Sequence, residues 1–145
     1  MKIVVQRVKN ARVSVEGSDK IVGEIARGLF VLVGIKKGDT TKEAEVLAEK
    51  LTKLRIMADE GGKMNLSVLD VKGEILVVSQ FTLIADTTGG NRPSFIDAAD
   101  PKIAREIYEQ LISSLKEKGV KVSSGSFGDY MRIEALLDGP VTIIL

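Results

Sequence analysis

The stretch "LFVLVGIKKGDTTKEAEVLAEKL", residues 29–51, decides the fold, because its hydrophobic pattern changes halfway along. Its first seven residues are almost all apolar, which is typical of a strand that is buried on both faces. After Thr40 the apolar residues recur at helical spacing, and Thr40 with Glu43 has the pattern of a capping box. The stretch therefore predicts a strand over 29–35 that is followed by a helix from about 41 to 57.

On the amino-terminal side of this stretch, apolar and polar residues alternate, as they do in strands with one buried face. The alternation runs from the start of the chain to Glu16, and Lys9-Asn10 favours a tight hairpin turn within it. A further strand over about 20–26 leads through Arg27-Gly28 into the apolar strand. This half of the chain is predicted to be an antiparallel meander.

On the carboxyl-terminal side, Gly61-Gly62 ends any helix and marks a loop, which an apolar strand, "ILVV", follows. A second helix is predicted to begin at Asp100-Pro101, an N-cap followed by proline at the first helical position, and to end at Lys118-Gly119. The remaining short strands are predicted at about 120–123, 130–137 and 141–145.

About eight strands and two main helices, joined mostly by hairpins, indicate an α+β fold. We expect mostly antiparallel β-sheets with both helices packed on one side. The chain has 145 residues and no linker, repeat or low-complexity tract, so a single domain over 1–145 is expected.

The composition limits the chemistry, because the sequence contains no cysteine and no histidine. A thiol nucleophile, a disulfide, a Cys/His zinc site and a Ser-His-Asp triad are all excluded. An enzyme of this composition must use hydroxyls, carboxylates, lysine, tyrosine, backbone N–H groups or groups on its substrate. We expect neither a metal site nor a cofactor.

Charge and hydropathy limit the partners and the location. The net charge of +1 argues against a surface that covers nucleic acid broadly, so an RNA partner would be held over a limited area. No apolar run approaches the ~20 residues that span a bilayer. The opening "MKIVVQRVKN" lacks the long apolar segment and cleavage site of a signal peptide. We therefore expect a cytoplasmic protein with no membrane partner.

Three stretches depart from their local patterns: "SQFTL" at 79–83, "GGNRPSF" at 89–95 and "DGPVT" at 138–142. Polar side chains after a buried strand either bond nearby backbone or face a ligand. The second stretch could equally be an ordinary surface loop bent at Pro93. The third could be a common turn before a terminal strand, and a cis proline there would be unusual on general grounds.

Together these stretches, with "GLFVLVGI" and "GKMNLSV" in the same order and spacing, resemble the D-aminoacyl-tRNA deacylase family along the whole chain. The family signatures are S-Q-x-T-L and N-x-G-P-[VF]-T. Leu137 stands where the second signature begins with Asn, whereas Gly139, Pro140 and Thr142 match it.

The resemblance implies the deacylase fold and a homodimer that hydrolyses the ester between a D-amino acid and the terminal adenosine of tRNA. It also implies action on glycine, as glycyl-tRNA mischarged on tRNA-Ala. The implied catalytic stretch comprises Ser79, Gln80, Phe81 and Thr82. The backbone N–H groups of Gln80 and Phe81 would stabilise an oxyanion, and the Thr82 hydroxyl would lie nearby. Phe81 would either face the adenine or be a plain core aromatic.

The second signature implies a cis peptide between Gly139 and Pro140, whose carbonyl oxygens reach the partner subunit's pocket. These oxygens would exclude an L side chain rather than recognise a D side chain. Arg7 would brace this element or meet a phosphate. Arg92 has the same two options, or is simply a solvated arginine.

Two other functions remain open. A non-catalytic binding module for the 3′ end of tRNA would share the fold and pocket. An ordinary esterase with Thr82 or Ser79 as nucleophile ranks lower, because the sequence has no histidine to activate either hydroxyl.

Overall fold

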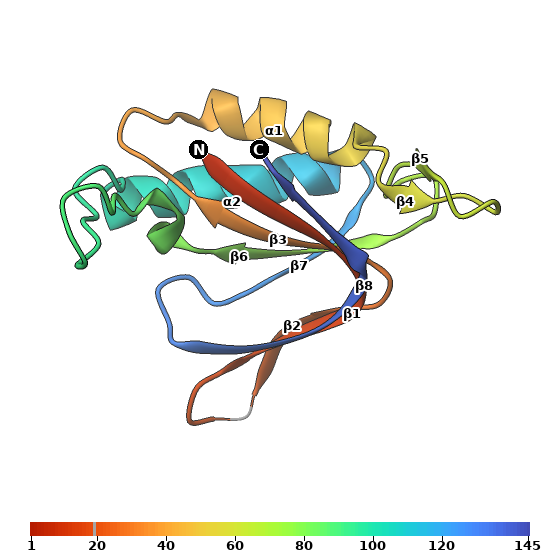
Figure 1. Ribbon diagram of the computed structural model, residues 1–145, viewed down its shortest axis with the longest axis horizontal. Coiled ribbons are helices and arrows are strands. Elements are labelled where there is room, and N and C mark those ends of the chain that lie inside the picture. Colours follow the sequence, from red (N-terminus) through yellow and green to blue (C-terminus); the bar gives the residue numbers. More distant parts are fainter. Residues whose placement is uncertain (19) are drawn as a thin grey trace.

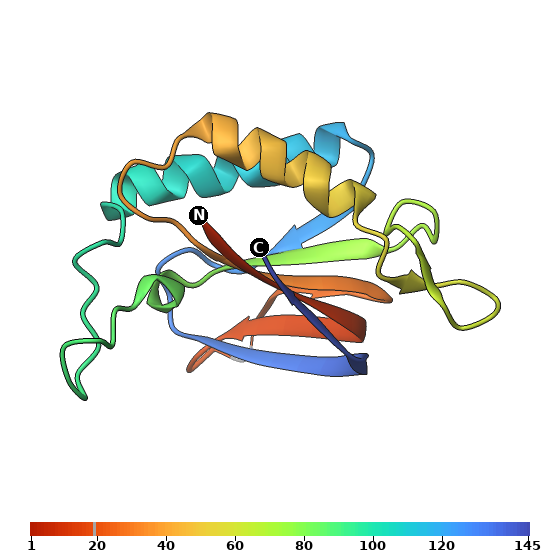
Figure 2. The same cartoon turned by 45° about the horizontal axis from the view of Figure 1, so that its top comes forward.

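The computed structural model describes residues 1–18 and 20–145, and it shows an α+β arrangement of a curved sheet covered by two helices. Helices α1 (Thr41–Lys53) and α2 (Pro101–Glu117) lie on the same face of the sheet in Figures 1 and 2. The predicted fold class is therefore confirmed, including the position of both helices on one side.

The main sheet has the strand order β2-β1-β3-β6-β7, and β8 pairs with β1. Its strands are β1 (Lys2–Val15), β2 (Ile21–Ile25), β3 (Gly28–Gly34), β6 (Glu74–Ser79), β7 (Lys121–Ser124) and β8 (Met131–Ile144). A separate two-stranded sheet is formed by β4 (Met57–Ala58), at the predicted end of the first helix, and β5 (Met64–Leu66), within the loop predicted around Gly61-Gly62.

The main sheet curls almost into a barrel, because its outer strands β2 and β7 approach each other. The Ser123 hydroxyl on β7 donates to the carbonyl of Glu24 on β2 at 2.7 Å. Gly23 makes this approach possible, since a Cβ there would lie 2.5 Å from the carbonyl oxygen of Ser124.

Two strand pairs are parallel, β3 with β6 and β6 with β7, and the chain between the strands of each pair includes a helix. The hairpin-based prediction did not include these crossovers. They bring the carboxyl-terminal ends of three strands, at Gly34, Ser79 and Ser124, to the same end of the sheet. We call this end of the sheet the carboxyl edge.

The apolar strand β3 is buried on both faces, as its sequence predicts. Leu29 and Val31 belong to the core between the sheet and the helices. Phe30 belongs to a second core inside the curled sheet, together with Val8 and Leu76. The strand that leads to the carboxyl edge is therefore held from both sides.

The predicted hairpin at Lys9-Asn10 is wrong, because β1 runs uninterrupted from Lys2 to Val15. Its first half pairs with β3 and its second half with β2, while β8 pairs with both halves. The register with β8 shifts between Gln6 and Asn10, so the strand accommodates the polar pair there without turning back.

Helix α2 begins where predicted, and the Asp100 carboxylate accepts from the Lys102 N–H at 2.9 Å. Helix α1 also begins as predicted, at Thr41, but ends at Lys53 rather than near 57. The chain beyond it is drawn into the core, where Ile56 is buried and its carbonyl accepts from Arg7.

The strands predicted at 130–137 and 141–145 are one strand, β8, which continues through Asp138-Gly139-Pro140. That tripeptide is therefore a corner within a strand rather than a turn between two strands, and we call it the corner. Among the described residues, no helix is long and apolar enough to cross a membrane.

Candidate active site

The stretch Ser79–Thr82 lies at the carboxyl edge, where β6 leads into the short 3-10 helix η1 (Phe81–Ile84). Ser79 is the half-buried last residue of β6 and pairs with Val33 of β3. The Gln80 backbone N–H donates to the Val33 carbonyl at 2.8 Å. The end of the strand is thus fixed to its neighbour just before the chain turns.

Gly34 allows η1 to pack directly on the end of β3. A Cβ at Gly34 would lie 2.9 Å from the Cβ of Leu83 and 3.2 Å from the carbonyl oxygen of Gln80. The first distance is shorter than packed atoms tolerate, and the second is tight. The glycine that ends the apolar strand therefore sets the position of the turn.

The turn presents backbone N–H groups at its start. Phe81 and Thr82 occupy the first two positions of η1, where N–H groups have no acceptor within the helix. The Gln80 N–H is already bonded to Val33, and the Gln80 side-chain amide donates to the Thr82 hydroxyl at 2.5 Å. Local bonds and free donors therefore coexist at the end of β6.

Phe81 is 56% exposed, so it is not a plain core aromatic. Its ring meets that of Phe95 edge to face, with centroids 5.0 Å apart. Phe95 belongs to the stretch "GGNRPSF", and a backbone bridge between Asp86 and Ser94 closes the loop that contains Arg92. Two of the three unusual stretches are thus adjacent, and Arg92 lies exposed in the loop beside them.

The third stretch forms the corner of β8, and its Gly139–Pro140 peptide is cis, as predicted. Gly139 has a φ of +134°, and a Cβ there would lie 2.8 Å from the backbone nitrogen of Val141. Only glycine fits this conformation without displacing the chain. Leu137 precedes the corner, pairs with Val8 of β1 and is 43% exposed.

The side chain of Arg7 contacts Asp138 of the corner and is only 10% exposed. Its Nε lies 3.1 Å from both the carbonyl oxygen and the carboxylate Oδ2 of Asp138. Its Nη1 donates to the Ile56 carbonyl at 2.8 Å. In this structure Arg7 braces the residue that precedes the Gly-Pro peptide.

The structure does not bring the corner and η1 together within one chain. Val8, beside the corner, pairs with Gly28 at the start of β3, whereas Ser79 pairs with Val33 near its end. These positions are about 16 Å apart along the strand, at ~3.3 Å per residue. Figures 1 and 2 show the same separation, with η1 on the left of the sheet and the bend of β8 on its right.

The loop after β7 also borders the carboxyl edge, although the sequence did not single it out. The Gly125 N–H donates to the Val77 carbonyl at 2.9 Å, and the buried Tyr108 hydroxyl donates to the same oxygen at 2.8 Å. Phe127 packs against the Tyr108 ring, and the Arg105 guanidinium lies over Phe127 at 5.3 Å. The only sequence signal for the loop after β7 is a Gly- and Ser-rich stretch that follows a predicted strand.

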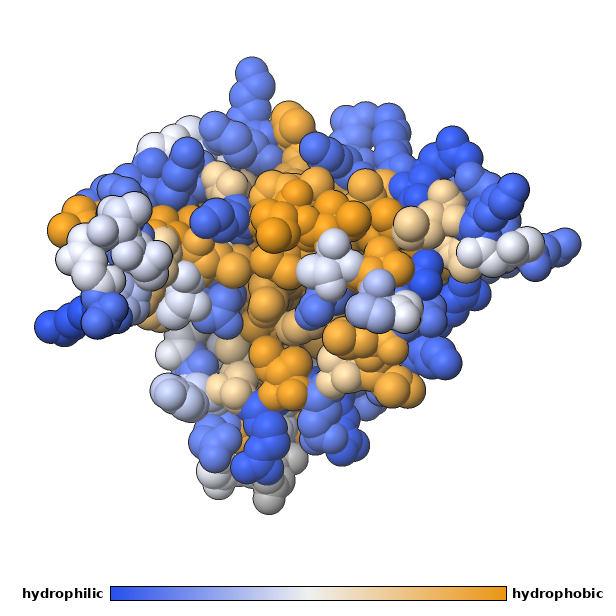
Figure 3. Space-filling model, in the orientation of Figure 1, coloured by the Kyte–Doolittle hydropathy of each residue, from blue (hydrophilic) through white to orange (hydrophobic). Residues whose placement is uncertain are grey.

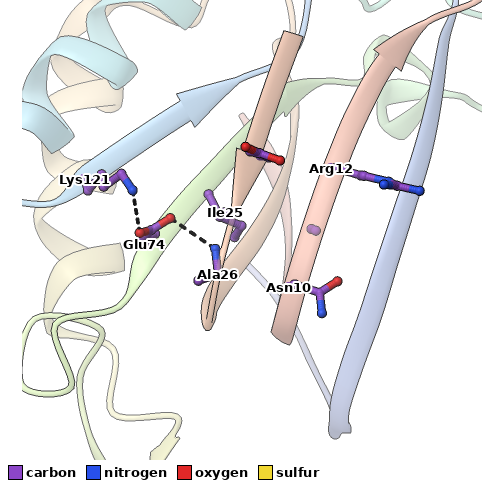
Figure 4. Close-up of a pocket in the computed structure, with 8 residues that line it drawn as sticks. Asn10, Arg12, Ile25, Ala26, Glu74 and Lys121 are labelled. Atoms are coloured by element: carbon purple, nitrogen blue, oxygen red, sulfur yellow. Dashed lines mark hydrogen bonds and ion pairs between the residues drawn. The ribbon is translucent and has the colours of Figure 1, made fainter. Parts of the chain in front are cut away.

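A second candidate site is a polar cleft of about 470 Å³ beside the first residues of β6 and β7, at the end of these strands that lies away from the carboxyl edge (Figure 4). Lys121 forms an ion pair with Glu74 at 2.7 Å, and this bond lowers the pKa of the Glu74 carboxyl. The other oxygen of Glu74 accepts from the Ala26 N–H at 3.1 Å. Arg12, on the far wall, is paired with Glu134. The charges of Glu74, Lys121 and Arg12 therefore have partners within the protein. Glu24 lines the same cleft.

Comparison with known proteins identifies the family. A family model described as D-Tyr-tRNA(Tyr) deacylase matches residues 4–145. The chain belongs to this family. Proteins named D-aminoacyl-tRNA deacylase from Thermosipho africanus and Carboxydothermus hydrogenoformans are 50% and 53% identical over 145 residues, which cover 100% of this chain and 96% and 99% of those proteins.

Solved structures show the same fold as this chain. A structure named c-Myc DNA Unwinding Element Binding Protein superposes with a TM-score of 0.92 at 42% identity, covering 100% of this chain and 97% of that one. A probable eukaryotic D-amino acid tRNA deacylase has the same fold, with a TM-score of 0.84 at 16% identity and coverage of 99% and 97%. The resemblance found in the sequence is confirmed, and it supports the predicted hydrolase class.

Proposed function

We propose that this protein hydrolyses the ester bond of D-aminoacyl-tRNA and releases the free D-amino acid and tRNA. The observation that carries the proposal is the exposed start of η1, where the N–H groups of Phe81 and Thr82 have no acceptor within the helix. Fixed donors of this kind stabilise the oxyanion that develops when water attacks an ester carbonyl. Removal of one such donor typically slows a reaction by ~10²–10³-fold.

The donor pair proposed here is Phe81 with Thr82, one residue beyond the pair that the resemblance suggests. The Gln80 N–H is bonded to Val33, which makes it part of the sheet. The Gln80 side chain instead holds the Thr82 hydroxyl, and this bond orients the second residue of the turn. Ser79 anchors the turn to β3 through its place in β6.

The substrate supplies the group that the protein lacks. With no histidine or cysteine in the sequence, the ribose hydroxyl next to the ester is the group that orients and activates water. Water then adds to the carbonyl carbon and releases a proton. The bond between this carbon and the ribose oxygen breaks, and the ribose oxygen takes up a proton in place of that bond. No acyl-enzyme forms on Thr82 in this mechanism.

A homodimer completes the site in our proposal. Because the corner lies far from η1 of its own chain, a second copy is needed to place a Gly139-Pro140 element beside it. The corner carbonyls then occupy the space of an L side chain, and Arg7 keeps them in position. Glycine has no side chain to exclude, so glycyl-tRNA, including that mischarged on tRNA-Ala, is also hydrolysed.

The test is hydrolysis of matched D- and L-tyrosyl-tRNA by the purified protein, with its oligomeric state measured by sedimentation at the assay concentration. We expect rapid loss of the D ester, little loss of the L ester, and a dimer. Binding of the tRNA 3′ end with no turnover would favour the non-catalytic module. A fully active monomer would contradict the shared site.

A further inference from the structure

We infer that three lysines beside the carboxyl edge, Lys36, Lys37 and Lys102, bind phosphates of the single-stranded 3′ end of the tRNA. This inference rests on the proposed function, because it assumes that the ester is bound at η1. It adds the surface over which the preceding nucleotides run. We call these residues the edge lysines.

The position of Lys36 and Lys37 carries the first step. They directly follow the end of β3, two and three residues beyond the glycine on which η1 packs. The Lys37 N–H donates to the Asp97 carbonyl at 2.9 Å, and Lys36 bridges to Ala98. The backbone of both lysines is therefore fixed, while their side chains are exposed beside the catalytic turn.

Lys102 extends the same surface from helix α2. It lies exposed in the first turn of the helix, and the Ala99 N–H just before that turn donates to the Ile35 carbonyl at 3.1 Å. The segment that leads into α2 therefore runs along the end of β3. Phe95, which contacts the exposed Phe81, belongs to this same segment. The edge lysines and the pair of Phe81 and Phe95 thus lie on neighbouring segments of one surface, which we call the ledge.

The charges of the edge lysines are not neutralised by close contacts. In the chain apart from residue 19, ion pairs involve the cations of Met1, Arg7, Arg12, Lys53, Lys121 and Arg132, and none involves an edge lysine. Nearby carboxylates are engaged elsewhere: Asp39 with the Met1 amino group and Asp100 with the Lys102 N–H. A bond from a neutral N–H group leaves the charge of Asp100 in place, so Asp97 and Asp100 together offset two of the three charges, and the ledge keeps one net positive charge.

The substrate has groups that match this ledge. An ester bound at η1 places the terminal adenosine there, so the phosphates of the last nucleotides must cross the adjoining surface. Single-stranded nucleic acid is commonly held by cations that follow its backbone and aromatic rings beside its bases. A ledge of three lysines also agrees with a net charge of only +1, which favours a limited contact area.

The experiment compares the triple variant Lys36→Gln/Lys37→Gln/Lys102→Gln with a matched control, Lys50→Gln/Lys116→Gln/Lys118→Gln, whose lysines are also exposed. Each protein is assayed on D-tyrosyl-tRNA and on D-tyrosyl-adenosine, which has no phosphate. The logarithm of tRNA affinity falls linearly with the logarithm of salt concentration, and three phosphate contacts to a single strand contribute ~2 to that slope. A fourfold rise in salt should therefore reduce the tRNA affinity of the wild type about 20-fold more than that of the triple variant.

We expect a raised KM for D-tyrosyl-tRNA and a flatter salt dependence in the edge variant, with the control matching wild type. All three proteins should hydrolyse D-tyrosyl-adenosine equally, which also shows that the edge variant is folded. Equal salt slopes for edge variant and wild type, or an equal loss in the control, would overturn the inference alone. Failure of the wild type on both esters would overturn the proposed function.

Discussion

The carboxyl edge and the polar cleft lie at opposite ends of the same strands, and they treat polar groups in opposite ways. At the cleft, Glu74 binds both the Lys121 ammonium and a backbone N–H. The carboxyl edge lies at Ser79, five residues after Glu74 along β6. There the N–H groups of Phe81 and Thr82, at the start of η1, have no acceptor within the helix, and the ring of Phe81 is exposed.

This difference shows why volume alone is a poor guide to function. The cleft has room for a ligand, but Glu74, Lys121 and Arg12 already have partners and would have to exchange them for a ligand's groups. The N–H groups of Phe81 and Thr82 at the carboxyl edge have no acceptor within η1, so they are available to a developing charge. Unused hydrogen-bonding capacity distinguishes the two regions.

The largest expected effect comes from the substrate at the carboxyl edge. D-tyrosyl-tRNA ending in 2′-deoxyadenosine lacks the hydroxyl next to the ester, so hydrolysis should slow by ~10²–10⁴-fold, the usual worth of a positioned acid or base. Single-turnover rates on the deoxy and natural substrates measure this effect. Thr82→Ala is the companion variant and should retain substantial activity. A fully competent deoxy substrate, or an acylated Thr82, would contradict the mechanism.

The next effect is expected at the corner, through Arg7. Arg7→Met leaves the Ile56 carbonyl and the Asp138 carboxylate without their cation. Breaking a buried pair costs ~3–5 kcal/mol, and because Asp138 is partly exposed we expect about 3 kcal/mol or less in urea unfolding. The looser corner should also hydrolyse L esters faster relative to D esters.

Arg92→Met is the matched control for the Arg7 variant, because Arg92 lies exposed in a loop. Its free energy of unfolding should stay within ~0.5 kcal/mol of wild type. If Arg7→Met unfolds at the same urea concentration as this control, Arg7 does not brace the corner.

A smaller effect is expected for Gly34→Ala, which tests how the turn is positioned. The added Cβ would lie 2.9 Å from the Leu83 Cβ, so η1 must shift. Overpacking of this kind costs ~1–3 kcal/mol. Displacement of the donors should lower kcat by up to ~10²-fold, with a smaller change in KM.

Gly61→Ala is the control for Gly34→Ala, since its Cβ would meet only the Asp59 carboxylate, at an ordinary 3.4 Å. It should leave both kcat and the free energy of unfolding nearly unchanged. Wild-type kcat in a stably folded Gly34→Ala protein would show that the turn does not depend on this contact.

Local signals predicted the helices well and the strand connections poorly. The caps at Thr40 and at Asp100 act through neighbouring residues, and both helices start where these caps place them. Lys9-Asn10 resembles a turn only when its neighbours in space are ignored, because pairing with β8 keeps the strand extended. The parallel pairs of β6 depend on crossovers that no local pattern encodes.

The same limit applies to the site. The two signatures identify Ser79–Thr82 and Gly139-Pro140 by resemblance, but their separation along β3 follows from strand register, which a single sequence does not reveal. The bond of the Gln80 N–H to Val33 and the exposure of Phe81 depend on the same packing. Sequence therefore names most of the candidate residues, whereas geometry shows which of their groups are free.

The smallest effect is expected at the polar cleft, for Glu74→Gln. In the folded protein the Lys121 ammonium lowers the pKa of Glu74, so the charged carboxylate is favoured by folding. Its contribution is present above the unfolded pKa of ~4.3 and is lost as pH falls below that value. Because the Lys121 side chain is 73% exposed, although that of Glu74 is only 17% exposed, we expect a loss of about 1 kcal/mol or less at neutral pH and a flatter decline in stability below about pH 4.5 in the variant. Urea unfolding of wild type and variant at pH 7 and pH 4 measures both quantities.

Hydrolysis of D-tyrosyl-tRNA by the Glu74→Gln variant at pH 7 should be unchanged, since the cleft lies at the other end of the strands from η1. A large loss of activity in a stable Glu74→Gln protein would mean that the cleft takes part in the reaction and that its internal pairing does not mark it as structural.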